Sequence, residues 1–80
     1  MAVKLLFFAH CADWMKESKF EVGCSAPKPL IDLLGENSRF QPILEHRALL
    51  KVAVNRKLAG LETEVKDGDE VAFLPPFSGG

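Results

Sequence analysis

The feature that most constrains the fold of this chain is the order of its apolar patterns. Residues 3–9 and 20–25 alternate with a period of two, which indicates β-strands. Residues 30–34 instead carry leucines at i, i+3 and i+4, which is typical of one face of a helix. Residues 49–55 and 70–74 return to a strand-like composition. A length of 80 residues predicts that all of these elements belong to one domain.

This order predicts an α+β fold, with a mixed sheet of four to five strands packed on one main helix plus a short helix. Two strands that form a hairpin, followed by a crossover helix, fit a β-grasp (ubiquitin-like) fold, in which the first and last strands lie side by side in the middle of the sheet. We expect residues 10–19 to form a loop or a short helix, Asn55 and Arg56 a tight turn, and residues 57–60 a fragment of strand. A capping box at Ser38 predicts where the short helix begins. Residues 1–74 are assigned to the domain and residues 75–80 to an extended C-terminal tail.

The outer face of the predicted sheet is unexpectedly apolar. Leu6 and Phe8 lie on the face of the first strand opposite the one that packs on the helix, and Ala72 and Leu74 do the same on the last strand. With the two strands adjacent, Phe8 and Leu74 come close together at the base of the tail. Large exposed apolar patches are rare on monomers, so this arrangement predicts a partner-binding surface. The alternative is that residues 10–19 cover the patch.

The sequence ends in a diglycine, which suggests that the reactive group is the terminal carboxylate. The last six residues are Pro75, Pro76, Phe77, Ser78, Gly79 and Gly80. The two prolines stiffen the tail toward polyproline geometry, and six extended residues reach at most ~20 Å. Two glycines without β-carbons could thread a narrow channel, so residues 75–79 are expected to enter a partner's pocket and Gly80 to carry the chemistry. A frayed end without function is the alternative.

A carboxylate must be activated before it can transfer its acyl group, most simply as an acyl-adenylate made from ATP. The sequence contains neither of the two common glycine-rich phosphate-binding motifs. We therefore expect no cofactor bound by this chain and a second protein that uses the ATP.

The charge pattern limits the partners. A net charge of −1 argues against general nucleic-acid binding. Residues 61–80 hold five acids and one base, which predicts either an acidic patch near the tail that docks on a basic partner or a solvated rim. No apolar run approaches ~20 residues, so no membrane association is expected. With no pattern typical of a signal peptide, the chain is expected to be cytoplasmic, with reduced thiols at Cys11 and Cys24.

Other chemistry-bearing residues do not predict a site. Cys11, Cys24, His10 and His46 lack the usual spacings of metal ligands, so no metal site is expected. The side chain of Cys24 is expected in the core. Asp69 and the residue after it point to opposite faces of a strand and cannot act as an acid pair, so turn formation and contact with a basic partner are their expected roles.

Three segments resemble a known family, the small subunit of molybdopterin synthase (MoaD). They are the ending D-G-D-E-V-A-F-L-P-P-F-S-G-G at 67–80, the strand end V-A-V-N at 52–55, and the first strand K-L-L-F-F-A at 4–9. The resemblance covers the whole chain. Residues 9–15 depart from the A-R-E-x-x-G segment usual in the family, which affects only the first loop and its contacts.

The resemblance implies a sulfur carrier that is not catalytic alone. An E1-like enzyme would adenylate Gly80 with ATP, and a sulfur donor would convert it to a thiocarboxylate. The tail would then enter the large subunit, within a heterotetramer, and deliver sulfur to cyclic pyranopterin monophosphate. The interface residues of the family align with Phe8, Leu58 and Leu74.

Two other functions stay open from the sequence. One is a related carrier for thiamine synthesis or tRNA thiolation, which Pro75 and Pro76 disfavour because those families lack the pair. The other is a protein modifier that forms isopeptide bonds with lysines.

Overall fold

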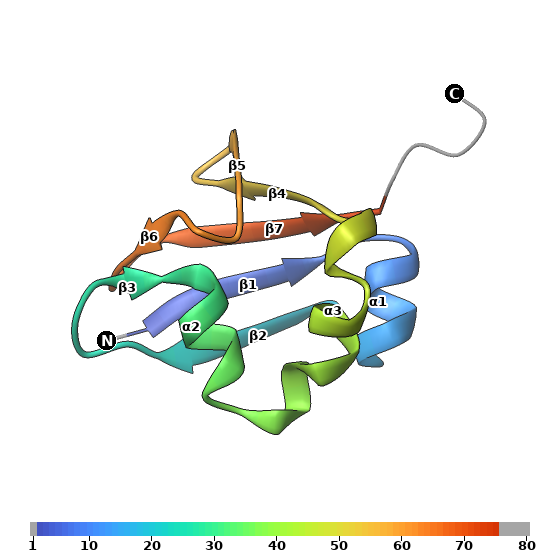
Figure 1. Ribbon diagram of the computed structural model, residues 1–80, viewed down its shortest axis with the longest axis horizontal. Helices are drawn as coiled ribbons and strands as arrows, with labels where there is room; N and C mark the ends of the chain where they lie inside the picture. Colours follow the sequence, from blue (N-terminus) through green and yellow to red (C-terminus); the bar gives the residue numbers. More distant parts are fainter. Residues whose placement is uncertain (1, 76–80) are drawn as a thin grey trace.

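A mixed sheet forms the centre of the molecule in the computed structural model, which describes residues 2–75 (Figure 1). Within those residues the sheet has five strands in the order β2–β1–β7–β4–β5, with bounds β1 Ala2–Phe7, β2 Lys19–Gly23, β4 Lys51–Val54, β5 Lys57–Ala59 and β7 Glu70–Leu74. The central strands β1 and β7 are parallel, and the other pairs of this sheet are antiparallel. The predicted α+β fold, with its first and last strands adjacent in the middle, is confirmed.

Short helices cover one face of the sheet, as the front view in Figure 1 shows for α2 and α3. The helical elements are α1 (His10–Met15), α2 (Leu30–Gly35), the 3-10 turn η1 (Ser38–Phe40), α3 (Gln41–Glu45) and the 3-10 turn η2 (Arg47–Leu49). A small second sheet pairs β3 (Lys28–Pro29) with β6 (Glu64–Val65). Within residues 2–75, no helix combines the length and the apolar character needed to span a bilayer.

The leucine-rich segment forms α2, as the spacing predicts. Leu30, Leu33 and Leu34 are buried against the sheet, while Ile31 on the other side of the helix is partly exposed. Pro29 precedes the first helical residue, and the helix ends at Gly35. Burying three leucines on one face is what stabilises so short a helix, because isolated helices of this length are unstable in water.

The second helical segment begins at Ser38, as the sequence predicts, but Ser38 is not its cap. The cap is Asn37, whose side chain accepts a hydrogen bond from the backbone N–H of Arg39 at 3.0 Å. Ser38 is instead the first residue of η1, which continues into α3. Phe40 and Ile43 of this segment are buried in the core.

The strand predicted at 49–55 is shorter in the structure. β4 covers Lys51–Val54 only, because Leu49 closes the turn η2 and Asn55 begins the next turn. Asn55 and Arg56 have φ angles of 51° and 71°, both in the left-handed region that asparagine tolerates better than most residues. This tight turn, predicted from the sequence, joins β4 to β5.

Residues 10–19, predicted to be a loop or a short helix, contain α1. The chain enters the helix through a tight turn in which the carbonyl of Phe8 accepts a hydrogen bond from the N–H of Cys11 at 2.9 Å. Ala9 adopts φ 50° and ψ −123° within this turn, a backbone conformation that residues other than glycine rarely adopt. The turn directs Cys11 and Met15 into the core and leaves Phe8 on the other face of the sheet.

Candidate functional site: the open face of the sheet

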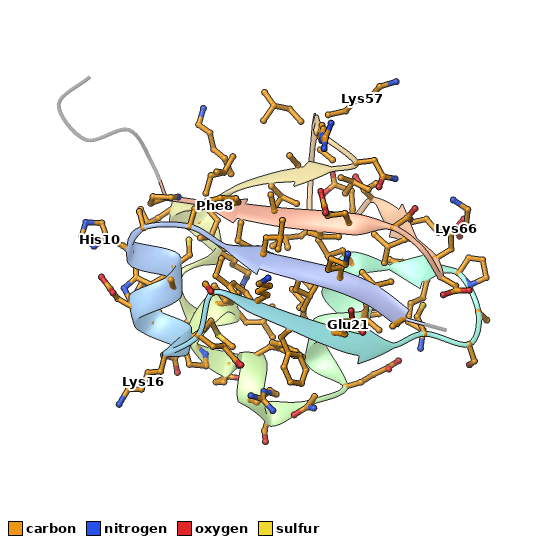
Figure 2. All side chains as sticks on the ribbon, turned by 180° about the vertical axis from the view of Figure 1, so that it is seen from behind. Phe8, His10, Lys16, Glu21, Lys57 and Lys66 are labelled. Atoms are coloured by element: carbon orange, nitrogen blue, oxygen red, sulfur yellow. The ribbon has the colours of Figure 1, made fainter. Side chains whose placement is uncertain are left out.

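One face of the sheet carries no helix, as Figure 2 shows from behind with the strands in front of the helices. Strand alternation and register place a band of apolar side chains on this open face. At its centre Leu6 lies opposite Ala72, Ala72 opposite Ala53, and Ala53 opposite Leu58. The open face therefore presents two small alanines between larger residues, across four adjacent strands.

The predicted neighbours Phe8 and Leu74 meet at the end of the sheet where β7 ends. The N–H of Phe8 donates to the carbonyl of Phe73 at 3.1 Å, which continues the parallel β1–β7 ladder by one residue and brings Phe8 beside Leu74. Lys51 faces Leu74 from β4. The alternative that residues 10–19 cover this patch is wrong for Phe8, because its side chain is 45% exposed and α1 packs its buried residues into the core.

Leu58 is the most exposed large apolar residue among residues 2–75, at 76%. It lies on the edge strand β5 and shares the open face with Phe8 and Leu74. The structure thus brings all three predicted interface residues to one face, with Leu58 at its far edge.

The tail leaves the body at this same end. β7 ends at Leu74, and the half-buried Pro75 is the last residue that the structure describes. The tail residues Pro76, Phe77, Ser78, Gly79 and Gly80 lie outside the described residues, so their predicted roles remain predictions. In the described part, Pro75 directly follows the last residue of the central strand β7.

Sequence reasoning missed one exposed apolar residue near the base of the tail. Leu49 was expected in the third strand, but it lies in η2, two residues before Lys51, with 54% of its side-chain surface exposed. Leu49 is thus close in sequence to β4, the strand whose first residue, Lys51, faces Leu74 at the end of β7. Nothing in the local pattern distinguishes it from the strand residues that follow.

The acidic cluster does not lie near the base of the tail. Its members flank β6 and the start of β7, at the opposite end of the sheet from the chain exit in Figure 1, and are Glu62, Glu64, Asp67, Asp69 and Glu70. The prediction of an acidic patch near the tail is wrong because β7 separates the acidic residues at its start from the tail at its end. The two ends of a five-residue strand lie about 14 Å apart.

Asp69 is a buried structural residue and not a contact for a basic partner. The residue is 7% exposed, and its carboxylate accepts hydrogen bonds from the Asn55 side chain at 3.0 Å and from the Lys66 backbone N–H at 2.9 Å. The Lys66 ammonium lies 3.4 Å away. The hydrogen bond from Asn55, followed by those from Lys66, holds the pKa of Asp69 below its ordinary value against the opposing effect of burial.

The cysteines and histidines form no cluster in the described part of the chain. Cys11 and Cys24 are both buried and free, and burial raises the pKa of the Cys11 thiol. His46 stacks on Trp14 with ring centroids 3.9 Å apart, and its Nδ1 lies 2.7 Å from the carbonyl oxygen of Pro42. Among residues 2–75 there is no group of three His, Cys, Asp or Glu side chains suited to a metal ion.

Known proteins share both the sequence and the fold of this chain. Residues 5–80 match the ThiS family. The molybdopterin synthase sulfur carrier subunit of Escherichia coli is 36% identical over 83 aligned positions, which cover 98% of this chain and 99% of that protein.

Two solved structures extend the comparison. SAMP1 from Haloferax volcanii superposes with a TM-score of 0.78 at 26% identity, with both chains fully covered. A protein–protein complex of subunits 1 and 2 of the molybdopterin-converting factor from Helicobacter pylori contains a chain that matches with a TM-score of 0.65 at 32% identity, again with full coverage of both. The chain belongs to the ThiS family, and within it to the MoaD-type group of molybdopterin synthase sulfur carrier subunits.

Proposed function

We propose that this chain is the sulfur carrier subunit of a molybdopterin synthase. An E1-like enzyme adenylates the carboxylate of Gly80, and a sulfur donor converts it to a thiocarboxylate. The thiocarboxylate then delivers its sulfur to cyclic pyranopterin monophosphate in the active site of the large subunit. Family membership and full-length similarity to sulfur carrier subunits support this role.

The observation that carries the proposal is the continuity between the open face and the tail. β7 contributes Ala72 and Leu74 to the face and then runs into residues 75–80. A large subunit that covers Phe8 and Leu74 lies directly beside the chain exit, so docking and delivery of the tail become one event. The structural match to a chain in a complex of two molybdopterin-converting subunits is consistent with such a partner.

The chemistry divides between the chain and its partners. The carboxylate oxygen of Gly80 attacks the α-phosphate of ATP and releases pyrophosphate. A nucleophilic sulfur from the sulfur donor then displaces AMP from the acyl carbon. The chain has no nucleotide-binding motif, and we assign ATP binding to the activating enzyme. What the chain contributes is an exposed apolar face for docking and a narrow end that reaches into another protein's site. We expect these reactions to take place in the cytoplasm.

A protein modifier is the second candidate, favoured by the structural likeness to SAMP1, a small archaeal modifier protein. The two functions share adenylation and differ in the acceptor. A carrier accepts sulfur at its activated carbonyl, whereas a modifier forms an amide with a lysine.

Intact mass spectrometry distinguishes the two functions. The chain is incubated with an E1-like activating enzyme, ATP and a sulfur source, and we expect one oxygen-to-sulfur exchange that maps to the C-terminal peptide. Deletion of Gly80 should abolish both this exchange and molybdopterin formation, while Cys11→Ser serves as a control for sulfur bound at a thiol. Lysine-linked conjugates without sulfur exchange, or molybdopterin formed by the deletion variant, would contradict the proposal.

A further inference from the structure

The strand β5 alone does not hold the exposed side chain of Leu58 in a fixed orientation. β5 has three residues, lies at the edge of the sheet, and pairs only with β4 within the described chain. A short edge strand with few packed side chains opens locally at low free-energy cost. The orientation of Leu58 on the open face therefore depends on what fixes the β4–β5 hairpin.

The hairpin is fastened at its turn by the side chain of Asn55. Its Oδ1 accepts a hydrogen bond from the backbone N–H of Glu70 at 3.0 Å, and its Nδ2 donates to Oδ1 of Asp69 at 3.0 Å. The backbone N–H of Asn55 also donates to the carbonyl of Glu70 at 2.7 Å. Three hydrogen bonds thus join one turn residue to the start of β7.

Asp69 joins this turn to the rest of the sheet. Its second carboxylate oxygen accepts from the backbone N–H of Lys66 at 2.9 Å, and its backbone carbonyl accepts from the N–H of Lys4 in β1 at 2.9 Å. Because the carboxylate is buried against the turn at Asn55 and the loop at Lys66, it is not free to touch a docking protein. The network links β1, β7 and the β4–β5 hairpin at the end of the sheet opposite the tail.

We propose that Asn55 and Asp69 are positioning residues for partner binding, which hold the β4–β5 hairpin so that Leu58 lines up with Ala53 and Ala72 on the open face. The inference rests on the proposed function, since it concerns the face that the large subunit covers. Both residues act on docking through Leu58.

A double-mutant cycle tests whether Asn55 acts through Leu58. Asn55→Gly keeps the left-handed turn and removes both side-chain hydrogen bonds, and its affinity for the purified large subunit, measured by calorimetry, should fall about tenfold. In a Leu58→Ala background the same change should have almost no further effect, whereas in a Phe8→Ala background it should again cost about tenfold. Arg56→Gly is the matched control, because it alters the adjacent left-handed position without touching the network.

A general loss of stability would weaken binding equally in both backgrounds, and this result would overturn the proposal. So would an unchanged affinity of Asn55→Gly for the large subunit.

Amide hydrogen exchange provides a second measurement that needs no partner. In Asn55→Gly and in Asp69→Asn, the amides of residues 57–59 should exchange about tenfold faster, with β1 much less affected. Unchanged exchange in β5 would overturn the positioning role. Failure of the wild-type chain to bind the large subunit would overturn the proposed function instead, and the exchange rates would then decide the positioning role on their own.

Discussion

The two faces of the central sheet are built from the same strands, yet the covered face is mainly apolar, whereas the open face combines its apolar band with charged residues such as Lys4 and Glu70. On the covered face Val71 and Phe73 of β7 are fully buried, and Phe7 of β1 stacks on Phe73 with ring centroids 5.2 Å apart. On the open face Phe8 and Leu58 remain largely exposed. From this difference we expect apolar side chains of similar size to serve the fold on one face and docking on the other.

A single charged side chain qualifies this contrast. Asp69 is the one buried charged residue that the structure shows within 2–75, and it immediately precedes β7. Its hydrogen bonds satisfy the carboxylate, as burial of a charge requires. The fold therefore depends on one polar network at the end of the sheet as well as on apolar packing.

The largest expected effect comes from a large cavity in the covered face. Phe73→Ala should lower the free energy of unfolding by about 3–5 kcal/mol, because it removes a fully buried ring and its stacking contact with Phe7. Urea denaturation followed by far-UV circular dichroism measures this loss. Leu74→Ala, the next residue along on the open face, should cost less than about 1.5 kcal/mol. Equal losses at the two positions would mean that the faces do not differ as described.

A charge on the open face should give the opposite pattern. Phe8→Asp should weaken binding to the large subunit by about 2–4 kcal/mol if the ring is buried there as a hot spot, while the free energy of unfolding changes little. Calorimetry and urea denaturation measure the two quantities on the same variant. Ile31→Asp is the matched control, since it introduces the same negative charge at an exposed apolar residue of α2 on the helical side. Normal affinity in Phe8→Asp would remove Phe8 from the interface.

The smallest effect concerns acid stability. Because the pKa of Asp69 is lowered in the folded state, the carboxylate contributes stability above its unfolded pKa of about 3.9, and this contribution is lost as the pH falls through the lower folded pKa. Denaturation curves between neutral and acid pH should therefore show a weaker pH dependence for Asp69→Asn, along with a loss of about 1–3 kcal/mol at neutral pH.

Asn55→Gly, which removes the largest cause of the shift, should lie between Asp69→Asn and the wild-type chain. Identical pH dependence in all three proteins would argue against a stabilising role for the Asp69 carboxylate.

Much of this protein follows from local pattern. Strand alternation by itself put Leu6 and Phe8 on the opposite face from Phe7. The leucine spacing fixed α2, and the Asn55–Arg56 step fixed a turn. These features depend on neighbours close in sequence, where backbone geometry and side-chain period decide the structure.

Other features depended on contacts between residues far apart in the sequence. From the sequence, Asp69 resembled an exposed acid in a turn. It is a buried acceptor only because the fold brings Asn55, 14 positions earlier, to the start of β7. Leu49 resembled a strand residue in the sequence, but in the structure it lies in η2 and outside the sheet. The sequence alone determined which side chains are apolar and which face each one takes. The tertiary structure decided which of those faces is covered, because burial depends on what the rest of the chain brings against it.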